Sequence, residues 1–356
     1  MYQSFRIKNF RCFRDLTLEP LARVNLIAGM NNVGKTALLE ALFLHIGPNN
    51  PDLSLRINAI RGIERLPMDA EEIWGWLFFR KNTKEAIELT SVGQDGEQRT
   101  LRIRLEGPQE SEIISPVAPP RIEGSLTTLS RHGGLVMEYG DSSGQIGTSR
   151  AFITIDGTET KLQIERARLA PLPVGVFSTT RQRFPREDAE RFSSLERVGR
   201  EREVLNALQI LEPHLRRLAV LTIGGMSMIH GDIGIGELVP LPIMGEGMVR
   251  LVSVVLAIAN APHGTVLIDE IENGLHYSVM MDVWKAIAYA ARQADAQVFA
   301  TTHSWECIQA AHLAFESTGT YDFCLHRLDR LDGDIQAVTY DQAKLGTAIM
   351  TDLEVR

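Results

Sequence analysis

Residues of the kind that bind phosphate stand together near the start of the chain. Residues 29–36 (Gly-Met-Asn-Asn-Val-Gly-Lys-Thr) fit the pattern Gly-x-x-x-x-Gly-Lys-Ser/Thr completely. Glycines let the backbone curl so that successive N–H groups point inward at phosphate oxygens. In this pattern Lys35 is predicted to place a cation on the β- and γ-phosphates, and the Thr36 hydroxyl can ligate Mg²⁺. The predicted nucleotide contacts here are Gly29, Asn31, Asn32, Val33, Gly34, Lys35 and Thr36.

Two adjacent carboxylates follow an apolar run later in the chain. Residues 265–268 (Thr-Val-Leu-Ile) have the pattern of a buried strand, and Asp269 and Glu270 come directly after it. Asp269 is predicted to hold Mg²⁺ and Glu270 to polarise an attacking water. A carboxylate at the end of a buried strand can also be a structural cap. The phosphate-binding pattern in the same chain favours the catalytic interpretation.

One histidine stands at a similar place on the next expected strand. His303 follows the strand-like residues 297–301, 34 positions after Asp269. The carboxyl ends of parallel strands form the ligand side of a sheet, so His303 is predicted to lie near the γ-phosphate. A single histidine is more often structural, and it is its place after the carboxylate pair that favours a catalytic role.

The elements around these residues alternate between strands and helices. A phosphate loop requires a strand before it and a helix after it. The sequence predicts this order, with a strand at 23–28, the glycine loop at 29–36 and a helix at 36–46. Strands alternating with helices predict a mainly parallel sheet. The expected elements after residue 245 are helices at 248–260, 277–293 and 305–316 and strands at 265–269, 297–301, 321–328 and 334–340.

The middle of the chain is less regular. Residues 70–80 are predicted to be a helix with an aromatic side, and residues 107–150, rich in glycine and proline, to form loops and short strands. Residues 185–217 have leucines at helical spacing and predict one or two solvated helices. A cluster of arginines, interleaved with acids, lies before and within the start of this segment and favours a solvated face, with a DNA or partner contact as the alternative. The arginines of the cluster are Arg181, Arg183, Arg186 and Arg191. The remaining expected strands are 4–10, 15–19, 85–93, 97–105, 151–155, 161–164 and 174–178.

Composition limits the class of protein. The net charge of −8, from 37 basic and 45 acidic residues, argues against a surface that wraps nucleic acid everywhere, so any DNA contact must be a local patch. Three separated cysteines suggest neither a zinc site nor a disulfide framework. No signal peptide and no run long enough to span a bilayer is visible. A cytoplasmic protein is expected.

At this point a family resemblance is visible. Residues 269–276 (Asp-Glu-Ile-Glu-Asn-Gly-Leu-His), followed by residues 301–304, resemble ABC-type ATPases of the OLD (overcoming lysogenization defect) group. The opening residues 7–13 resemble the start of the same group and of RecF and SMC-like repair ATPases. The resemblance implies ATP and Mg²⁺ as cofactors. The roles that it implies are catalysis for Lys35, Glu270 and His303, metal binding for Thr36 and Asp269, a dimer contact for Asn273 and Gly274, and a phosphate contact for Arg11.

This class of ATPase also closes a signature loop over the ATP of a second subunit. The candidate here is Gly245, Glu246 and Gly247, directly before the helix expected at residues 248–260. Gly245 stands where the family usually has a serine, so backbone amides at a helix N-terminus would have to make the contact. A plain turn before a helix is the alternative. No reliable Q-loop glutamine is visible, and Gln182 is only a weak candidate.

The predicted fold is therefore α/β: a P-loop NTPase of the ABC-ATPase head type. It has a mixed β N-terminal lobe, a mainly parallel central sheet and an inserted helical and β arm region, which is not a long coiled coil because sustained heptads are absent. We expect an N-terminal ATPase lobe with a β-rich insertion at 1–170, a helical insertion at 171–235 and a C-terminal ATPase lobe at 236–356.

OLD proteins commonly carry a Toprim nuclease, but only about 50 residues follow His303 here, so we expect any nuclease to be a separate chain. Three functions remain open. The first is the ATPase subunit of a bacterial antiphage defence system, acting as an ATP-sandwiched dimer or higher homo-oligomer with a separate effector. The others are a DNA-repair ATPase and an ATP-dependent assembly scaffold. The acids of the tail, interpreted as hairpin and surface residues, are Asp322, Asp329, Asp332 and Asp334.

Overall fold

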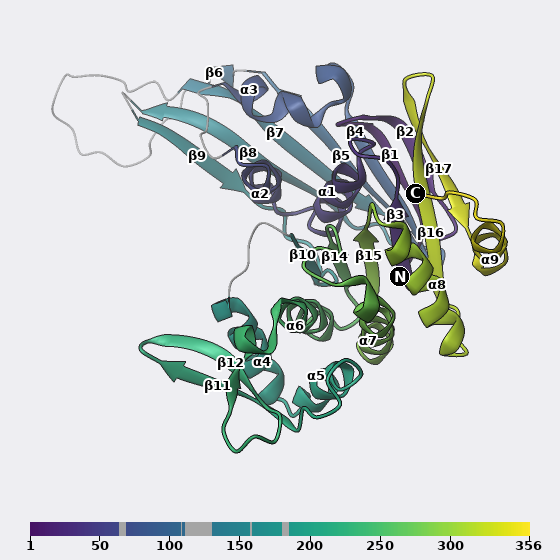
Figure 1. Ribbon diagram of the computed structural model, residues 1–356. Helices are drawn as coiled ribbons and strands as arrows, with labels where there is room; N and C mark the ends of the chain where they lie inside the picture. The colour runs from purple at the N-terminus through teal and green to yellow at the C-terminus, as the bar shows by residue number, and fades with distance from the viewer. Residues whose placement is uncertain (64–68, 108, 111–129, 157–158, 180–184) are drawn as a thin grey trace, which may run out of the picture.

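The computed structural model describes residues 1–63, 69–107, 109–110, 130–156, 159–179 and 185–356. Within these ranges the strands form three sheets, and helices pack against them (Figure 1). The α-helices are α1 (Lys35–Ile46), α2 (Asp52–Ile60), α3 (Ala70–Trp74), α4 (Pro185–Glu196), α5 (Glu201–Leu208), α6 (Glu246–Ala259), α7 (Met280–Gln293), α8 (Trp305–Ser317) and α9 (Gln342–Met350). Short 3₁₀ turns are η1 (Gly75–Leu77), η2 (Phe79–Lys81), η3 (Leu241–Met244) and η4 (Tyr277–Val279).

A six-stranded sheet forms the centre of the molecule. Its first five strands run parallel, and the sixth is antiparallel to its neighbour. The segments that follow parallel strands all lie at one edge of a sheet. The predicted mainly parallel sheet is confirmed. In spatial order the strands are β10 (Gly175–Ser178), β14 (Thr265–Ile268), β15 (Gln297–Thr301), β3 (Val24–Ala28), β16 (Phe323–Leu331) and β17 (Asp334–Tyr340).

A larger antiparallel sheet faces it and corresponds to the predicted β lobe. Both the N-terminal strands and the middle of the chain contribute to it. Its strands, in spatial order, are β2 (Phe13–Leu18), β1 (Tyr2–Phe10), β4 (Ile87–Gly93), β5 (Gln98–Glu106), β7 (Ser130–Asp141), β8 (Ile146–Asp156) and β9 (Glu159–Glu165), and β6 (Gln109–Glu110) pairs with β7.

The central strands are apolar on both faces because each face is covered. Successive side chains of a strand point to opposite faces. Val266 and Ile268 therefore join the core under α6 and α7, whereas Leu267, between them, joins the core shared with α1 and the antiparallel sheet. Val298 and Phe299 divide in the same way on β15. Figure 1 shows α1 between the two sheets and α6 and α7 on the opposite face of the central one.

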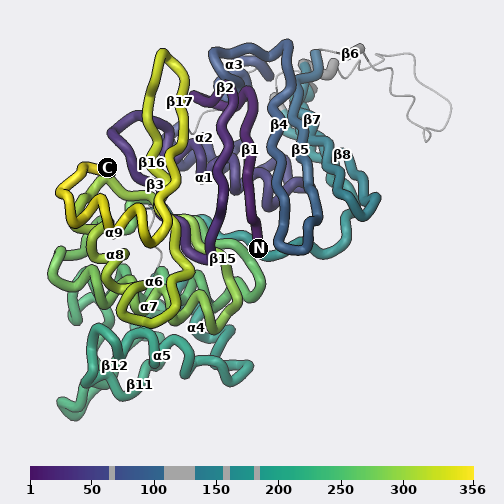
Figure 2. The backbone as a smooth tube through the Cα atoms, turned by 90° about the vertical axis from the view of Figure 1, so that its right-hand side faces the viewer, coloured from purple at the N-terminus to yellow at the C-terminus, as the bar shows by residue number. Residues whose placement is uncertain are grey.

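The remaining elements lie at one end of the molecule. Figures 1 and 2 show α4, α5 and the hairpin of β11 (Arg217–Ile223) and β12 (Met226–Asp232) on the far side of α6 and α7 from the antiparallel sheet. The short strand β13 (Val239–Pro240) pairs with β12. Within the predicted helical insertion at 171–235, β10 belongs to the central sheet and β11–β12 is a hairpin. The division of the chain at residues 170 and 235 stays a prediction.

Two local predictions were wrong. Within residues 107–150, β7 and β8 are long paired strands rather than short ones. Their glycines permit close backbone approach, since a Cβ on Gly134 would lie 2.6 Å from the Ala151 carbonyl oxygen. The helix predicted at 70–80 ends as α3 at Trp74. It is followed by separate 3₁₀ turns, because Phe78 is extended and pairs with Phe10.

The final helix α9 and the β11–β12 hairpin were not predicted from the sequence. Asp341 caps α9 by accepting a hydrogen bond from the Lys344 N–H, and an aspartate before a helical run is a start signal. Gly224 and Gly225, both at positive φ, form the hairpin turn. A Gly-Gly pair between two alternating runs is likewise a recognisable hairpin signal.

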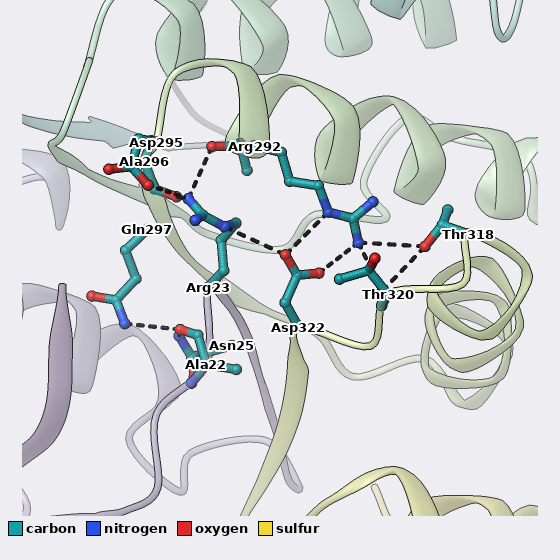
Figure 3. A network of polar contacts seen from close by, with 11 residues as sticks. Ala22, Arg23, Asn25, Arg292, Asp295, Ala296, Gln297, Thr318, Thr320 and Asp322 are labelled. Atoms are coloured by element: carbon teal, nitrogen blue, oxygen red, sulfur yellow. Dashed lines mark hydrogen bonds and ion pairs between the residues drawn. The ribbon is translucent and has the colours of Figure 1, made fainter. Parts of the chain in front are cut away.

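Ion pairs tie the amino ends of the parallel strands together (Figure 3). Arg23, before β3, donates to Asp295 at 2.9 Å and lies 3.4 Å from Asp322. Arg292, at the end of α7, donates to both oxygens of Asp322. Asp322 is thus structural, as predicted for the tail acids. Two more of these acids form ion pairs, Asp329 with Arg327 and Asp334 with Arg14. The fourth, Asp332, lies in the turn between β16 and β17.

In the part of the chain that the structure describes, no helix is long and apolar enough to cross a membrane.

Candidate functional site

The phosphate loop joins β3 to α1, as the sequence predicted. Gly29, Asn32 and Gly34 have φ values of 141°, 65° and 97°, so the loop passes three times through the left-handed region. At Gly29 and Gly34 a side chain would also clash with neighbouring atoms. A Cβ on Gly29 would lie 2.6 Å from the Leu328 carbonyl oxygen, and one on Gly34 would lie 2.5 Å from the sulfur of Cys12. This packing holds the loop in a curled form that presents N–H groups to an anion.

The remaining loop residues divide between the core and solvent. Val33 is buried and packs behind the loop, with its Cγ2 2.9 Å from where a Cβ on Gly29 would lie. Met30, Asn31 and Asn32 are exposed. The loop is therefore anchored on its inner side and open on the side from which a nucleotide would approach.

Lys35 lies over this loop at the start of α1. Its Nζ donates to the carbonyl oxygens of Gly29 at 2.6 Å and Met30 at 3.0 Å. Burial lowers the pKa of Lys35 below its ordinary value, and the nearby carboxylates, Glu272 foremost, oppose that shift. The ammonium is thus held by the loop among acidic groups, where a polyphosphate would give it a stronger partner.

Asp269 links the phosphate loop to the neighbouring strand. The Thr36 hydroxyl donates to its two oxygens at 3.2 and 3.1 Å. The buried Thr301 hydroxyl donates to Oδ1 at 2.7 Å and accepts from the Glu270 N–H at 2.8 Å. Hydroxyls from α1 and β15 therefore meet at the carboxylate that directly follows β14. A hydroxyl and a carboxylate facing each other are hard oxygen donors of the kind that Mg²⁺ prefers.

The backbone at Glu270 is held in an unusual conformation. Its φ is 47°, in the left-handed region that a residue with a Cβ rarely adopts. Arg250, a buried residue of α6, donates from Nη2 to the carbonyl oxygens of Asp269 at 3.0 Å and Glu270 at 3.4 Å. Together with the bond from the Glu270 N–H to Thr301, these contacts fix the turn that follows β14.

His303 follows β15 and lies beside the turn after β14. Its backbone N–H and ring Nδ1 lie 2.8 and 3.0 Å from the same oxygen of Glu272. The His303 side chain is half-exposed, whereas that of Glu272 is 12% exposed. The expectation that His303 stands on the strand next to Asp269 is met, because β14 and β15 are neighbours in the sheet.

Arg11 has other partners than the predicted phosphate. It donates to the buried carboxylate of Glu40 at 3.1 Å, to Asn58 at 3.2 Å and to the Trp76 carbonyl oxygen at 3.3 Å. Glu40 also accepts from Arg61 at 2.6 Å. Burial lowers the pKa of Arg11, and the carboxylate opposes that shift. A phosphate contact by Arg11 would require these bonds to rearrange, and it stays a prediction.

The signature candidate lies at the N-terminus of α6. Gly245, at φ 109°, precedes the helix, and Glu246 is its first residue. A Cβ on Gly247 would lie 3.5 Å from the Leu275 side chain and 4.0 Å from the Gly274 carbonyl oxygen. The candidate therefore packs beside the turn that carries Asp269, Glu270 and Glu272, which includes the predicted dimer contacts Asn273 and Gly274.

Other predicted residues fall outside this site or outside the described residues. Arg186 and Arg191 pair with Glu190 and Glu187 on α4, which fits a solvated helix face. Arg181, Arg183 and the weak Q-loop candidate Gln182 lie outside the described residues.

Four polar residues of the site were not singled out from the sequence: Glu272, Thr301, Arg250 and Arg330. Arg330, on β16, donates to the Asn32 carbonyl oxygen of the phosphate loop at 3.1 Å. Arg250 carried a signal, since it is a lone cation beside a long apolar run. Glu272 and Thr301 lie inside the motifs already recognised, but their partners depend on strand pairing.

The chain is similar in sequence to several known proteins and families. A family model described as "AAA domain" matches residues 4–208, and one described as "AAA domain, putative AbiEii toxin, Type IV TA system" matches residues 137–306. An ATP/GTP phosphatase of Helicobacter pylori is 27% identical over 330 residues, which cover 87% of each protein. The OLD nuclease of Thermus scotoductus is 36% identical over 90 residues, or 25% of this chain and 14% of that protein.

A solved structure shares the fold. The SMC head bound to the C-winged helix domain of ScpA superimposes with a TM-score of 0.52 at 12% identity, covering 96% of this chain and 99% of that one. The predicted P-loop ATPase head is confirmed as a fold. Because the first family model spans more than half of the sequence, the chain belongs to the AAA domain family, and it is an ATPase.

Proposed function

We propose that the chain hydrolyses ATP with Mg²⁺ at the site formed by the phosphate loop and the turns after β14 and β15. The observation that carries this proposal is the meeting of Thr36 and Thr301 at Asp269. In the proposed site the phosphate loop binds the triphosphate, while Thr36 and Asp269 hold the metal. Bound Mg²⁺ would offset the charge that develops on the transferred phosphoryl group.

The other residues of the site then have separable tasks. Lys35 balances charge on the β- and γ-phosphates. The Glu270 carboxylate orients a water for in-line attack and accepts its proton. His303 contacts the terminal phosphate. The strained backbone at Glu270, held by Arg250 and Thr301, supports this assignment, because such strain is kept where the surroundings impose it.

We further propose that two chains enclose two ATP molecules. In this arrangement the phosphate loop of one chain faces residues 245–247 of the other, whose helix N-terminus suits an anion. Exposed apolar side chains on the elements that would meet support the idea: Met30 is 77% exposed, Ile243 75% and Tyr277 70%. Exposed apolar groups of this kind are typical of surfaces that a partner covers.

For the biological role we propose the ATPase subunit of an antiphage defence system that works with a separate effector, such as a Toprim-like nuclease. The motif at residues 269–276 and the partial match to an OLD nuclease support this assignment. That match covers 14% of the nuclease, so a nuclease activity is not proposed for this chain. A DNA-repair function and an assembly scaffold are the alternatives.

The test of the catalytic proposal is ATP binding and phosphate release by the purified chain. Lys35→Ala should abolish ATP binding, while Glu270→Gln should bind ATP and release phosphate at least about 100-fold more slowly. Lys344→Ala, an exposed lysine on α9, is the matched control for the first variant. If Lys35→Ala binds ATP as tightly as the unmodified chain, the site has been assigned wrongly.

The dimer and its partner need separate tests. The Glu270→Gln protein with Mg²⁺ and ATP should double in mass by light scattering, and Lys35→Ala should remain at its starting mass. A nuclease-like protein that co-purifies with the native chain would support the defence role. Tight, salt-sensitive DNA binding by the isolated chain would instead favour the repair function.

A further inference from the structure

Glu272 contacts both the backbone and the ring of His303. Its Oε1 accepts from the backbone N–H of His303 at 2.8 Å and lies 3.0 Å from the ring Nδ1. The two residues come from turns after neighbouring strands, β14 and β15. One carboxylate oxygen therefore fixes both where the His303 backbone lies and which way its ring is turned.

The burial of Glu272 indicates that this contact is specific. Its side chain is only 12% exposed, and among the described residues its Oε2 is buried without a hydrogen-bond partner. Leaving a carboxylate oxygen without a partner costs free energy, so such a group calls for an explanation. The nearby ammonium of Lys35 is part of that explanation. Of the carboxylates that act on this ammonium, Glu272 has the largest effect.

The contact has a consequence for the proton on the imidazole ring. A carboxylate only accepts hydrogen bonds, so Nδ1 must carry a hydrogen to bond with it. The neutral ring then leaves Nε2 as the nitrogen that can gain a proton. A protonated ring can donate from Nε2 to a phosphate oxygen while Nδ1–H stays on the carboxylate.

We propose that Glu272 is a positioning residue that holds the proton of His303 on Nδ1 and presents Nε2 to the terminal phosphate of ATP. The catalytic part of this inference rests on the proposed function, whereas the position of the proton does not. Glu272 acts through His303 and makes no contact with the nucleotide of its own.

The position of the proton is tested without turnover. In ¹⁵N-histidine spectra at pH 8.5, without nucleotide, the His303 signal should have the pattern of the Nδ1–H tautomer. A His303→Gln sample identifies that signal among the nine histidines. In Glu272→Ala the signal should change to the Nε2–H tautomer, which free imidazole side chains favour. A His303 signal in the Nε2–H form in the unmodified protein would overturn the inference even if the chain hydrolyses ATP.

The catalytic part is tested by a double-mutant cycle. Glu272→Ala should lower kcat by about tenfold, a coupling within the range found for groups in direct contact. Glu272→Gln, which keeps an acceptor oxygen, should retain more activity. In a His303→Ala background the Glu272→Ala change should have less than about a twofold further effect. Losses that multiply in the double variant would show that Glu272 does not act through His303.

Two measurements distinguish positioning from a structural or binding role. The Kd for ATP should stay the same or become tighter in Glu272→Gln, because a negative charge near the triphosphate is removed. Glu316→Gln makes the same change on the exposed side of α8 and should leave kcat unaltered. An increase in the ATP Kd that accounts for the whole loss of activity would contradict the inference. If none of the proteins hydrolyses ATP but the tautomer is as expected, only the proposed function fails.

Discussion

The strongest test of the site is the removal of one buried hydroxyl. Thr301 is fully buried, and its Oγ1 donates to Asp269 at 2.7 Å and accepts from the Glu270 N–H at 2.8 Å. Thr301→Val keeps the shape of the side chain and removes both bonds. The bond to the carboxylate is worth about 1.5–3 kcal/mol, and leaving the Glu270 N–H unpaired costs about 1–3 kcal/mol. Because the turn can relax, we expect the free energy of unfolding to fall by about 3 kcal/mol.

The same change should slow hydrolysis, because it releases Asp269 and Glu270 from their positions. A misplacement of about 1 Å can cost about 100-fold in rate, and we expect kcat to fall by about tenfold to 100-fold. Urea unfolding and phosphate release at saturating ATP and Mg²⁺ measure the two effects. Thr301→Ser keeps the hydroxyl and should retain both the free energy of unfolding and kcat. Thr265→Val, at the start of β14 and far from Asp269 at its end, is the control. A Thr301→Val protein with unaltered kcat would refute the reasoning.

Three further expectations concern the core and the phosphate loop. Burial lowers the pKa of His45 and His326 to about 4, from 6.5. Between these two pH values the unfolded chain therefore binds more protons than the folded one. The free energy of unfolding, measured by urea titration, should be at its full value above pH 6.5 and fall by roughly 3 kcal/mol per histidine towards pH 4. Gly34→Ala should weaken ATP binding more than about tenfold by calorimetry, since its Cβ would lie 2.5 Å from the sulfur of Cys12 at a φ of 97°. Glu40→Gln should lower the melting temperature and cost about 3 kcal/mol of unfolding free energy, because it leaves two arginines without a fully buried counter-charge. Stability that is equal at pH 7 and pH 4.5, or unaltered ATP affinity in Gly34→Ala, would contradict the first two; an unaltered melting temperature would contradict the third.

Local patterns predicted much of the fold. The phosphate loop was recognisable because its backbone torsions depend on two glycines, Gly29 and Gly34, that lie within one short segment of the chain. The strands at 265–268 and 297–301 were recognisable from short apolar runs that parallel sheets bury on both faces. The long strands β7 and β8 were not, because their glycines have the local pattern of loops. Pairing of β7 with β8 and with β5 offsets the lower strand propensity of those glycines.

The sequence by itself determined the chemical inventory of the site: a phosphate loop, a carboxylate pair at the end of a strand, and a histidine after the next strand. Tertiary structure decided how these parts are held. The order β14–β15–β3 brings Thr36 and Thr301 to Asp269, and places Glu272 against His303. Tertiary packing also pairs Arg11 with the buried carboxylate of Glu40 on α1. These contacts join residues far apart in the chain, and their distances depend on strand order and register, which no local pattern encodes.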